Sequence, residues 1–108
     1  MSDNLFSLDN QVVVITGAAG LLGRQHVDAV ARMGGIPVLL DLNADAVERM
    51  ADDINVRFGV PASGWSVDIT QEQEIEKNCA VLLARYGHVD GLVNNAANNP
   101  KVEGDGAK

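Results

Sequence analysis

Four short apolar runs alternate along the chain with three stretches in which apolar residues recur every three or four positions. The runs lie at residues 11–16, 36–41, 64–68 and 91–94. Such runs are typical of strands buried on both faces of a sheet, and the periodic stretches between them are typical of helices with one apolar face. Strict alternation of strand and helix favours right-handed crossovers between parallel strands. The pattern therefore predicts an α/β fold, a doubly wound parallel sheet of the Rossmann type, of which only the first four β/α units are present.

The ends of the three helices carry recognisable signals. Asn43 is a plausible N-cap of the second helix, and Gly59 and Gly87 stand where the second and third helices should stop. Thr70 and Gln73 have the spacing of a capping box at the start of the third helix.

The third helix is expected to bury one apolar stripe against the sheet. This stripe makes its cysteine a core thiol rather than a nucleophile. The residues of the stripe are Ile75, Cys79, Leu82, Leu83 and Tyr86.

Composition narrows the class of protein. Apolar residues make up 46% of the chain and charged residues 21%, as in an ordinary folded domain, and no apolar run is long enough to span a membrane. The polar N-terminus does not resemble a secretory signal, and a single cysteine fits a reducing cytoplasm. The net charge of −7 and scattered Lys and Arg residues disfavour nucleic acid and membrane surfaces as partners. His26 and His88 lack ligand-like neighbours, so no metal site is expected.

The length of the chain bears on its domain organisation. The sequence has 108 residues, whereas a doubly wound domain usually needs about 150 or more. We therefore expect residues 1–108 to be the N-terminal part of a single dinucleotide-binding domain and a fragment of a longer protein. Residues 98–108 are expected to form a polar tail or the start of a following loop.

Three glycines with the spacing Gly-x-x-Gly-x-x-Gly follow the first expected strand and open the first helix. Gly17 allows a tight turn, and Gly20 has no Cβ, so the backbone there can approach a pyrophosphate. Gly23 lies on the sheet-facing stripe and permits close packing of the helix. The N-terminus of the new helix offers free N–H groups to an anion. No Gly-Lys-Ser/Thr follows, which excludes a nucleoside-triphosphate P-loop.

Polar residues stand at the carboxyl ends of the other strands, where ligands bind in open α/β sheets. Asp41 ends the second strand, 24 residues after Gly17, near the position of an acid that accepts hydrogen bonds from an adenosine ribose. Asp68 ends the third strand, and Asn94 and Asn95 end the fourth. For Asn94, hydrogen bonds to neighbouring backbone are the favoured interpretation.

Together these motifs resemble the N-terminal half of the short-chain dehydrogenase/reductase family. The matching segments are TGAAGLLG at 16–23, Asp41, VDIT at 67–70 and VDGLVNNAA at 89–97. The resemblance implies that the glycine loop holds the pyrophosphate, that an acid at Asp41 favours NAD, that 68–69 meets adenine and that the backbone of 95–97 lies along the cofactor ribose. The implied cofactor-binding residues are Gly17, Gly20, Leu21, Leu22, Gly23, Asp41, Asp68, Ile69, Asn95, Ala96 and Ala97.

Catalysis in that family uses a Tyr-x-x-x-Lys pair and an upstream Ser. Tyr86 is the only tyrosine, and Asp90 rather than lysine stands four residues later. No residue of the chain is therefore expected to be catalytic, and the 108 residues alone should be inactive. The resemblance implies that the full-length protein is an NAD-dependent oxidoreductase. It would transfer hydride between the nicotinamide and the hydroxyl or carbonyl group of a small-molecule substrate, and work as a homo-oligomer.

Two other functions stay open. The glycine spacing is closer to the extended branch of the family, which suggests a nucleotide-sugar epimerase or dehydratase, whereas Asn-Asn-Ala at 94–96 favours the common branch. A non-catalytic NAD-binding regulator would lack the tyrosine and lysine altogether.

Overall fold

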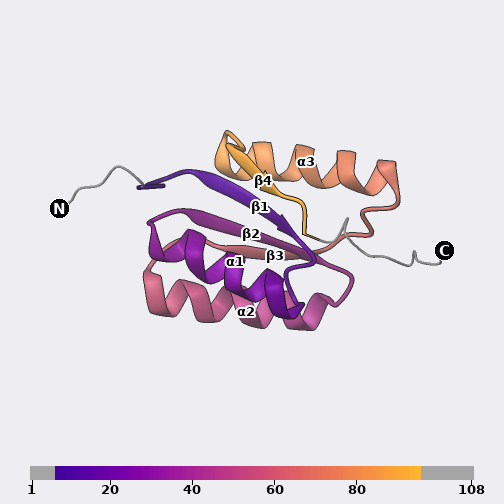
Figure 1. The fold of residues 1–108 in the computed structure, drawn as a ribbon. Coiled ribbons are helices and arrows are strands. Elements are labelled where there is room, and N and C mark those ends of the chain that lie inside the picture. The colour runs from indigo at the N-terminus through magenta and orange to yellow at the C-terminus, as the bar shows by residue number, and fades with distance from the viewer. Residues whose placement is uncertain (1–6, 96–108) are drawn as a thin grey trace.

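A computed structural model describes residues 7–95, which form one parallel sheet flanked by helices (Figure 1). Within this range the strand order is β3-β2-β1-β4, and all three neighbouring pairs are parallel. The α/β fold predicted from the sequence is confirmed. The elements are β1 (Val12–Thr16), α1 (Leu21–Arg32), β2 (Ile36–Asp41), α2 (Ala44–Phe58), β3 (Ser63–Ser66), α3 (Glu72–Tyr86) and β4 (Gly91–Val93).

The sheet separates two apolar layers. Helices α1 and α2 cover one face and α3 lies on the other (Figure 1). Successive side chains of a strand point to opposite faces, so Val13 and Ile15 of β1 pack in the α1–α2 layer while Val12 and Val14 pack in the α3 layer. All five residues of β1 are buried. Among the described residues, no helix has the length and apolar character needed to cross a membrane.

Most of the predicted helix ends are confirmed. Asn43 caps α2, and its side-chain oxygen accepts a hydrogen bond from Ala46 N–H at 3.1 Å. Gly59 and Gly87 end α2 and α3 in the left-handed region, with φ of 69° and 85°, a conformation that glycine adopts without steric cost.

The start of α3 differs from the prediction. Its N-cap is Gln71, which makes no side-chain cap, so the capping box of Thr70 and Gln73 is wrong. The Thr70 hydroxyl donates instead to the Asp68 carboxylate at 2.6 Å, and the Glu74 carboxylate accepts the Asp68 N–H at 2.9 Å. Asp68 is therefore hydrogen-bonded to the segment that leads into α3 and not to a neighbouring strand. Strand β3 therefore ends at Ser66, and Asp68 lies beyond the strand end rather than on it.

The apolar stripe predicted for α3 is only partly buried. Leu82 is 2% exposed, but Ile75 and Leu83 are 43% and 47% exposed, and Cys79 is exposed as well. The core-thiol interpretation of Cys79 is therefore wrong. The physical reason is that α3 is the one described helix on its face of the sheet, whereas two helices share the opposite face.

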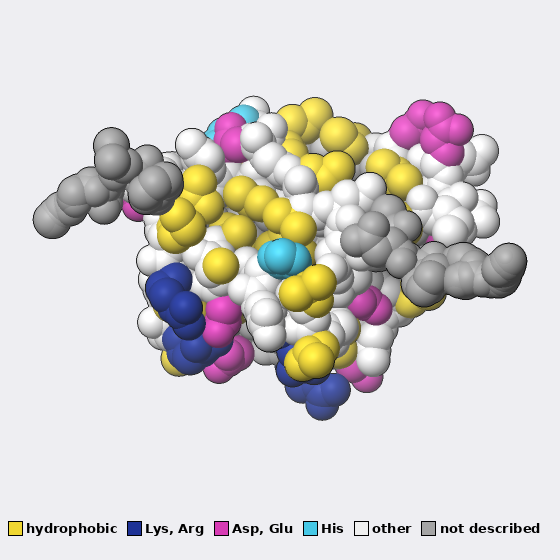
Figure 2. Space-filling model, viewed as in Figure 1, with side chains coloured by type: hydrophobic (Ala, Val, Ile, Leu, Met, Phe, Trp, Pro, Cys, Tyr) yellow, Lys and Arg dark blue, Asp and Glu magenta, His cyan; other side chains and the backbone are white. Residues whose placement is uncertain are grey.

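An apolar groove of about 400 Å³ results between α3 and the sheet, and Leu92 of β4 and Val89 are among its lining residues. Figure 2 shows hydrophobic side chains at the surface over the region where β4 and α3 lie.

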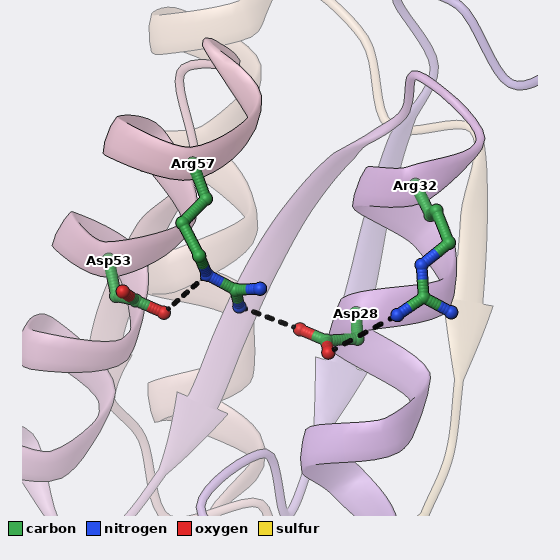
Figure 3. Close-up of polar contacts among 4 residues, drawn as sticks. All are labelled: Asp28, Arg32, Asp53 and Arg57. Carbon is green, nitrogen blue, oxygen red and sulfur yellow. Dashed lines mark hydrogen bonds and ion pairs between the residues drawn. The ribbon is translucent and has the colours of Figure 1, made fainter.

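Ion pairs join α1 and α2 on their outer side (Figure 3). The Arg57 guanidinium contacts Asp28 and Asp53, each at 2.9 Å, and Arg32 lies 3.7 Å from Asp28. The hydrogen bond to Asp28, followed by that to Asp53, raises the pKa of Arg57. These side chains are substantially exposed, so the network contributes little to stability.

Asn55 is expected to contribute strongly to stability. Its side chain accepts a hydrogen bond from Ala62 N–H at 2.7 Å and donates one to Ala62 O at 3.2 Å. These two bonds connect α2 to the residue that precedes β3. Ala62 is buried, so Asn55→Ala would leave the backbone N–H and C=O of Ala62 without these hydrogen bonds. The free energy of unfolding should fall by about 1–3 kcal/mol. Urea denaturation measures the change. The neighbouring Val56→Ala, at an exposed position, should cost less than about 0.5 kcal/mol; equal effects of the two would contradict this role.

Candidate functional site

The carboxyl ends of the parallel strands meet at one edge of the sheet, and the structure brings several predicted site residues together there. Asn95 Nδ2 donates to Gly17 O at 3.3 Å, and Ala19 N–H donates to Asp41 Oδ2 at 3.1 Å. The Thr16 hydroxyl lies 3.2 Å from Asn94 Oδ1. The glycine loop is thus joined to β2 on one side and to the end of β4 on the other.

The loop turns at its first glycine. Gly17 has φ of 64°, in the left-handed region, so the tight turn predicted there is confirmed. Gly20 N–H donates back to Gly17 O at 3.1 Å and closes the turn. Gly20 itself is extended, with φ of −75° and ψ of 171°, and it is the N-cap of α1. The absence of a side chain at Gly20 therefore leaves space rather than relieving backbone strain.

Gly23 allows close packing of α1 on the loop. It is buried, and a Cβ at this position would overlap Gly17 O and lie 2.8 Å from Ala18 Cα. The close approach expected from the sequence is present, although it is made to the loop rather than to the body of the strand.

Gly23→Ala should therefore destabilise the fold. Both groups that the new methyl meets belong to the backbone, so the loop or helix must move, at a cost of about 1–3 kcal/mol. Chemical denaturation of the two alanine variants provides the measurement. Gly20→Ala is the matched control, because its Cβ would meet Gly17 O at 3.4 Å and nothing closer. A Gly23→Ala protein as stable as the control would contradict the packing role.

The N-terminus of α1 is suited to an anion. Its N-cap makes no side-chain hydrogen bond and its first turn has no acidic residue, whereas Asn43 caps α2 and acidic residues stand in the first turns of α2 and α3. The first amides of α1, at Leu21 and Leu22, therefore face their end of the helix with no acidic side chain in their own first turn. The side chains of Leu21 and Leu22 are 82% and 53% exposed.

Asp41 lies at the end of β2, as predicted, and is half-buried. One carboxylate oxygen accepts the Ala19 N–H and the other accepts the Asn43 N–H, each at 3.1 Å. The spacing of Asp41 and Asn43 is a local turn signal. The contact with Ala19 spans 22 residues and has no counterpart in the local sequence pattern.

Asp68 and Ile69 lie between β3 and α3. The Thr70 hydroxyl, followed by the Thr70 N–H, lowers the pKa of the Asp68 carboxyl. That carboxylate therefore shapes the local turn. Ile69 is half-buried and lines the groove beside α3. Ala96 and Ala97 lie outside the described residues.

Tyr86 lies at the opposite edge of the sheet. Its hydroxyl donates to Pro61 O at 2.7 Å and lies 2.8 Å from Ser63 Oγ, at the start of β3. His88 and Asp90 share this edge, where the Asp90 carboxylate accepts the Val12 N–H at 2.8 Å. That hydrogen bond, with a smaller contribution from His88, lowers the pKa of Asp90. The contacts of these three residues close the amino ends of the strands and are remote from the glycine loop.

This chain is similar to known proteins in both sequence and fold. A family described as short chain dehydrogenase matches residues 11–105. The 7alpha-hydroxysteroid dehydrogenase of Escherichia coli K12 is 39% identical over 95 residues, which are 88% of this chain and 36% of that protein.

Two solved structures have similar folds. A short-chain dehydrogenase/reductase from Burkholderia phymatum in complex with NAD has a TM-score of 0.74 and 28% identity, over 82% of this chain and 31% of that one. The NADPH-dependent 3-quinuclidinone reductase of Rhodotorula rubra has a TM-score of 0.77 and 26% identity, over 82% and 33%. The chain thus spans about a third of the length of each of these three relatives. Because the family model matches residues 11–105 and the fold is the same parallel sheet, this chain belongs to the short-chain dehydrogenase/reductase family.

Proposed function

We propose that this chain is the cofactor-binding N-terminal part of an NAD-dependent oxidoreductase. The full-length protein would transfer hydride between the nicotinamide and the hydroxyl or carbonyl carbon of a small-molecule substrate. The observation that carries the proposal is the uncapped N-terminus of α1 beside the Asp41 carboxylate, within one hydrogen-bonded loop. A helix N-terminus that can bind an anion and a carboxylate that can accept hydrogen bonds from a ribose suit a dinucleotide.

Asp41 supports NAD over NADP in this proposal. The related structures include both an NADPH-dependent enzyme and a complex with NAD, so the preference depends on this chain's own residues. The residue after Asp41 is Leu42, which cannot neutralise a 2′-phosphate. Arg24 is the nearby cation, and its Nε donates to Ala19 O at 3.3 Å.

The residues of this chain would bind and orient the cofactor, which supplies the hydride chemistry. The amides of Leu21 and Leu22 would hold the pyrophosphate, and Gly20 would give it room. Asp41 would accept hydrogen bonds from the adenosine ribose, 68–69 would lie at the adenine, and the backbone of 95–97 would lie along the cofactor ribose. The family's catalytic acid/base is proposed to lie in a segment beyond these residues, since Tyr86 is engaged at the opposite edge.

One observation keeps a second function in consideration. The Gly-x-x-Gly-x-x-Gly spacing resembles that of the extended branch, so a nucleotide-sugar epimerase or dehydratase is the alternative. Such an enzyme would return the cofactor to its starting redox state, whereas a dehydrogenase would accumulate NADH. A non-catalytic regulator would bind NAD without either outcome.

The 108-residue chain alone is expected to give no turnover, whereas the full-length protein should reduce NAD with a small hydroxylated substrate. The reason is that the chain supplies the cofactor site without the tyrosine and lysine that move the proton. The assay follows NADH absorbance with a panel of secondary alcohols and polyols. Turnover by the 108 residues would contradict the assignment, and NAD binding without turnover by the full-length protein would favour the regulator. We also propose that the full-length protein is cytoplasmic, which its single cysteine supports, and a homo-oligomer, as the family resemblance implies.

A further inference from the structure

One hydrogen bond joins the glycine loop to β2 through a side chain rather than through the sheet. Ala19 N–H donates to Asp41 Oδ2, and the other oxygen of the same carboxylate accepts from Asn43 N–H, both at 3.1 Å. Asn43 is the N-cap of α2. The Asp41 carboxylate therefore connects the loop before α1 to the N-cap of α2.

The neighbouring loop amides have acceptors on the main chain. Ala18 N–H donates to Leu40 O and Gly20 N–H to Gly17 O, both at 3.1 Å. Of these three consecutive amides, only that of Ala19 donates to a side chain. Ala19 stands directly before Gly20, the N-cap, so the orientation of its peptide helps to set the direction of the first amides of α1.

The carboxylate has enough acceptor positions for a second task. An ionised carboxylate offers about four lone-pair sites. Ala19 and Asn43 take one on each oxygen. The remaining sites can accept ribose hydroxyls without release of the loop, so the two roles are compatible.

We propose that Asp41 is a positioning residue for the glycine loop, in addition to its contact with the adenosine ribose. Through Ala19 it holds the loop in the conformation that presents the α1 amides to the pyrophosphate. This inference rests on the proposed function, because the ligand concerned is the diphosphate of the dinucleotide.

The charge of Asp41 makes the two roles separable. A carboxylate near an anionic diphosphate repels it, so removal of that charge alone should tighten diphosphate binding. Loss of a positioning contact has the opposite sign. A ligand that has the diphosphate but no ribose hydroxyls, 2′,3′-dideoxy-ADP, cannot use the ribose contact and therefore reports on the loop.

The experiment measures binding of ADP, dideoxy-ADP and NAD to the full-length protein by calorimetry. Asp41→Ala should weaken dideoxy-ADP binding by about tenfold, the equivalent of one hydrogen bond to a charged group. Asp41→Asn keeps one oxygen acceptor and should lose less. Asp45→Ala is the matched control, because it removes a carboxylate from the first turn of α2 that makes no hydrogen bond to the loop. The control should bind dideoxy-ADP as the wild type does or more tightly.

Amide hydrogen exchange without ligand gives a second readout. In Asp41→Ala, exchange should accelerate at Gly20, whose own acceptor is intact, as well as at Ala19, while β1 stays protected.

Faster exchange at Ala19 alone, or dideoxy-ADP affinity that is unchanged or higher, would overturn the positioning role and leave the proposed NAD site unaffected. If Asp41→Ala does not fold, Asp41→Asn carries the comparison, with a smaller loss expected and no loss overturning the role. A folded wild type that binds neither NAD nor ADP would refute the proposed function itself.

Discussion

Gly20→Val is expected to weaken NAD binding by the full-length protein on the order of a hundredfold or more, while the fold persists. A side chain here would occupy space that the pyrophosphate needs in front of the α1 amides. Overpacking and the loss of charge-assisted hydrogen bonds each contribute about 1–3 kcal/mol, and each 1.4 kcal/mol is tenfold in affinity. The backbone at Gly20 is extended, with φ of −75°, so its conformation does not require glycine.

Calorimetry gives the NAD affinity, and circular dichroism checks the fold. Gly91→Ala is a suitable control, because Gly91 begins β4 at the opposite edge and a Cβ there would meet only Val13, at 3.8 Å. We expect the control to bind NAD like the wild type. Normal binding by a folded Gly20→Val protein would show that the loop is not the phosphate site.

The second large effect expected is a preference for NAD over NADP of about ten- to a thousandfold. The ribose 2′-hydroxyl would donate to the Asp41 carboxylate, whereas a 2′-phosphate would be repelled by it. Two unit charges about 4 Å apart repel by ~1 kcal/mol in water and ~4 kcal/mol at an effective dielectric of about 20. Converted to affinity, this range gives the stated preference. Arg24, tied to Ala19 O, is placed to reduce the effect.

The ratio of the NAD and NADP dissociation constants in the wild type and in Asp41→Ala measures this preference. The variant should lose most of the discrimination, and Asp45→Ala, which removes a similar charge from the first turn of α2, should keep it. A wild type that prefers NADP, or a ratio that Asp41→Ala leaves unchanged, would refute the assignment.

The fold was predictable because its signals are local. The apolar run Val12–Thr16 and the stops at Gly59 and Gly87 depend on short-range patterning and backbone geometry, and all are found where expected. The burial of α3 was not predictable in this way. Its periodicity is helical, but the exposure of Ile75 and Leu83 depends on what else covers that face of the sheet, which no local pattern encodes.

The site shows the same division. The glycine spacing and Asp41 can be identified along the chain because each satisfies a local requirement of turn, packing or strand end. The bonds from Asn95 to Gly17 and from Ala19 to Asp41 join residues 78 and 22 positions apart. Similarly, β3 ends before Asp68, which is hydrogen-bonded to Glu74 and Thr70 instead. Such choices depend on side-chain conformations in the folded protein.

The central claim is that the glycine loop and Asp41 form one dinucleotide site. A crystal structure of the full-length protein with NAD tests it most directly. We expect pyrophosphate oxygens within hydrogen-bond distance of the Leu21 and Leu22 amides. We also expect a ribose hydroxyl that donates to Asp41, with the Ala19 N–H still bonded to the same carboxylate. A dinucleotide bound away from the N-terminus of α1, or bound there with no contact to Asp41, would contradict it.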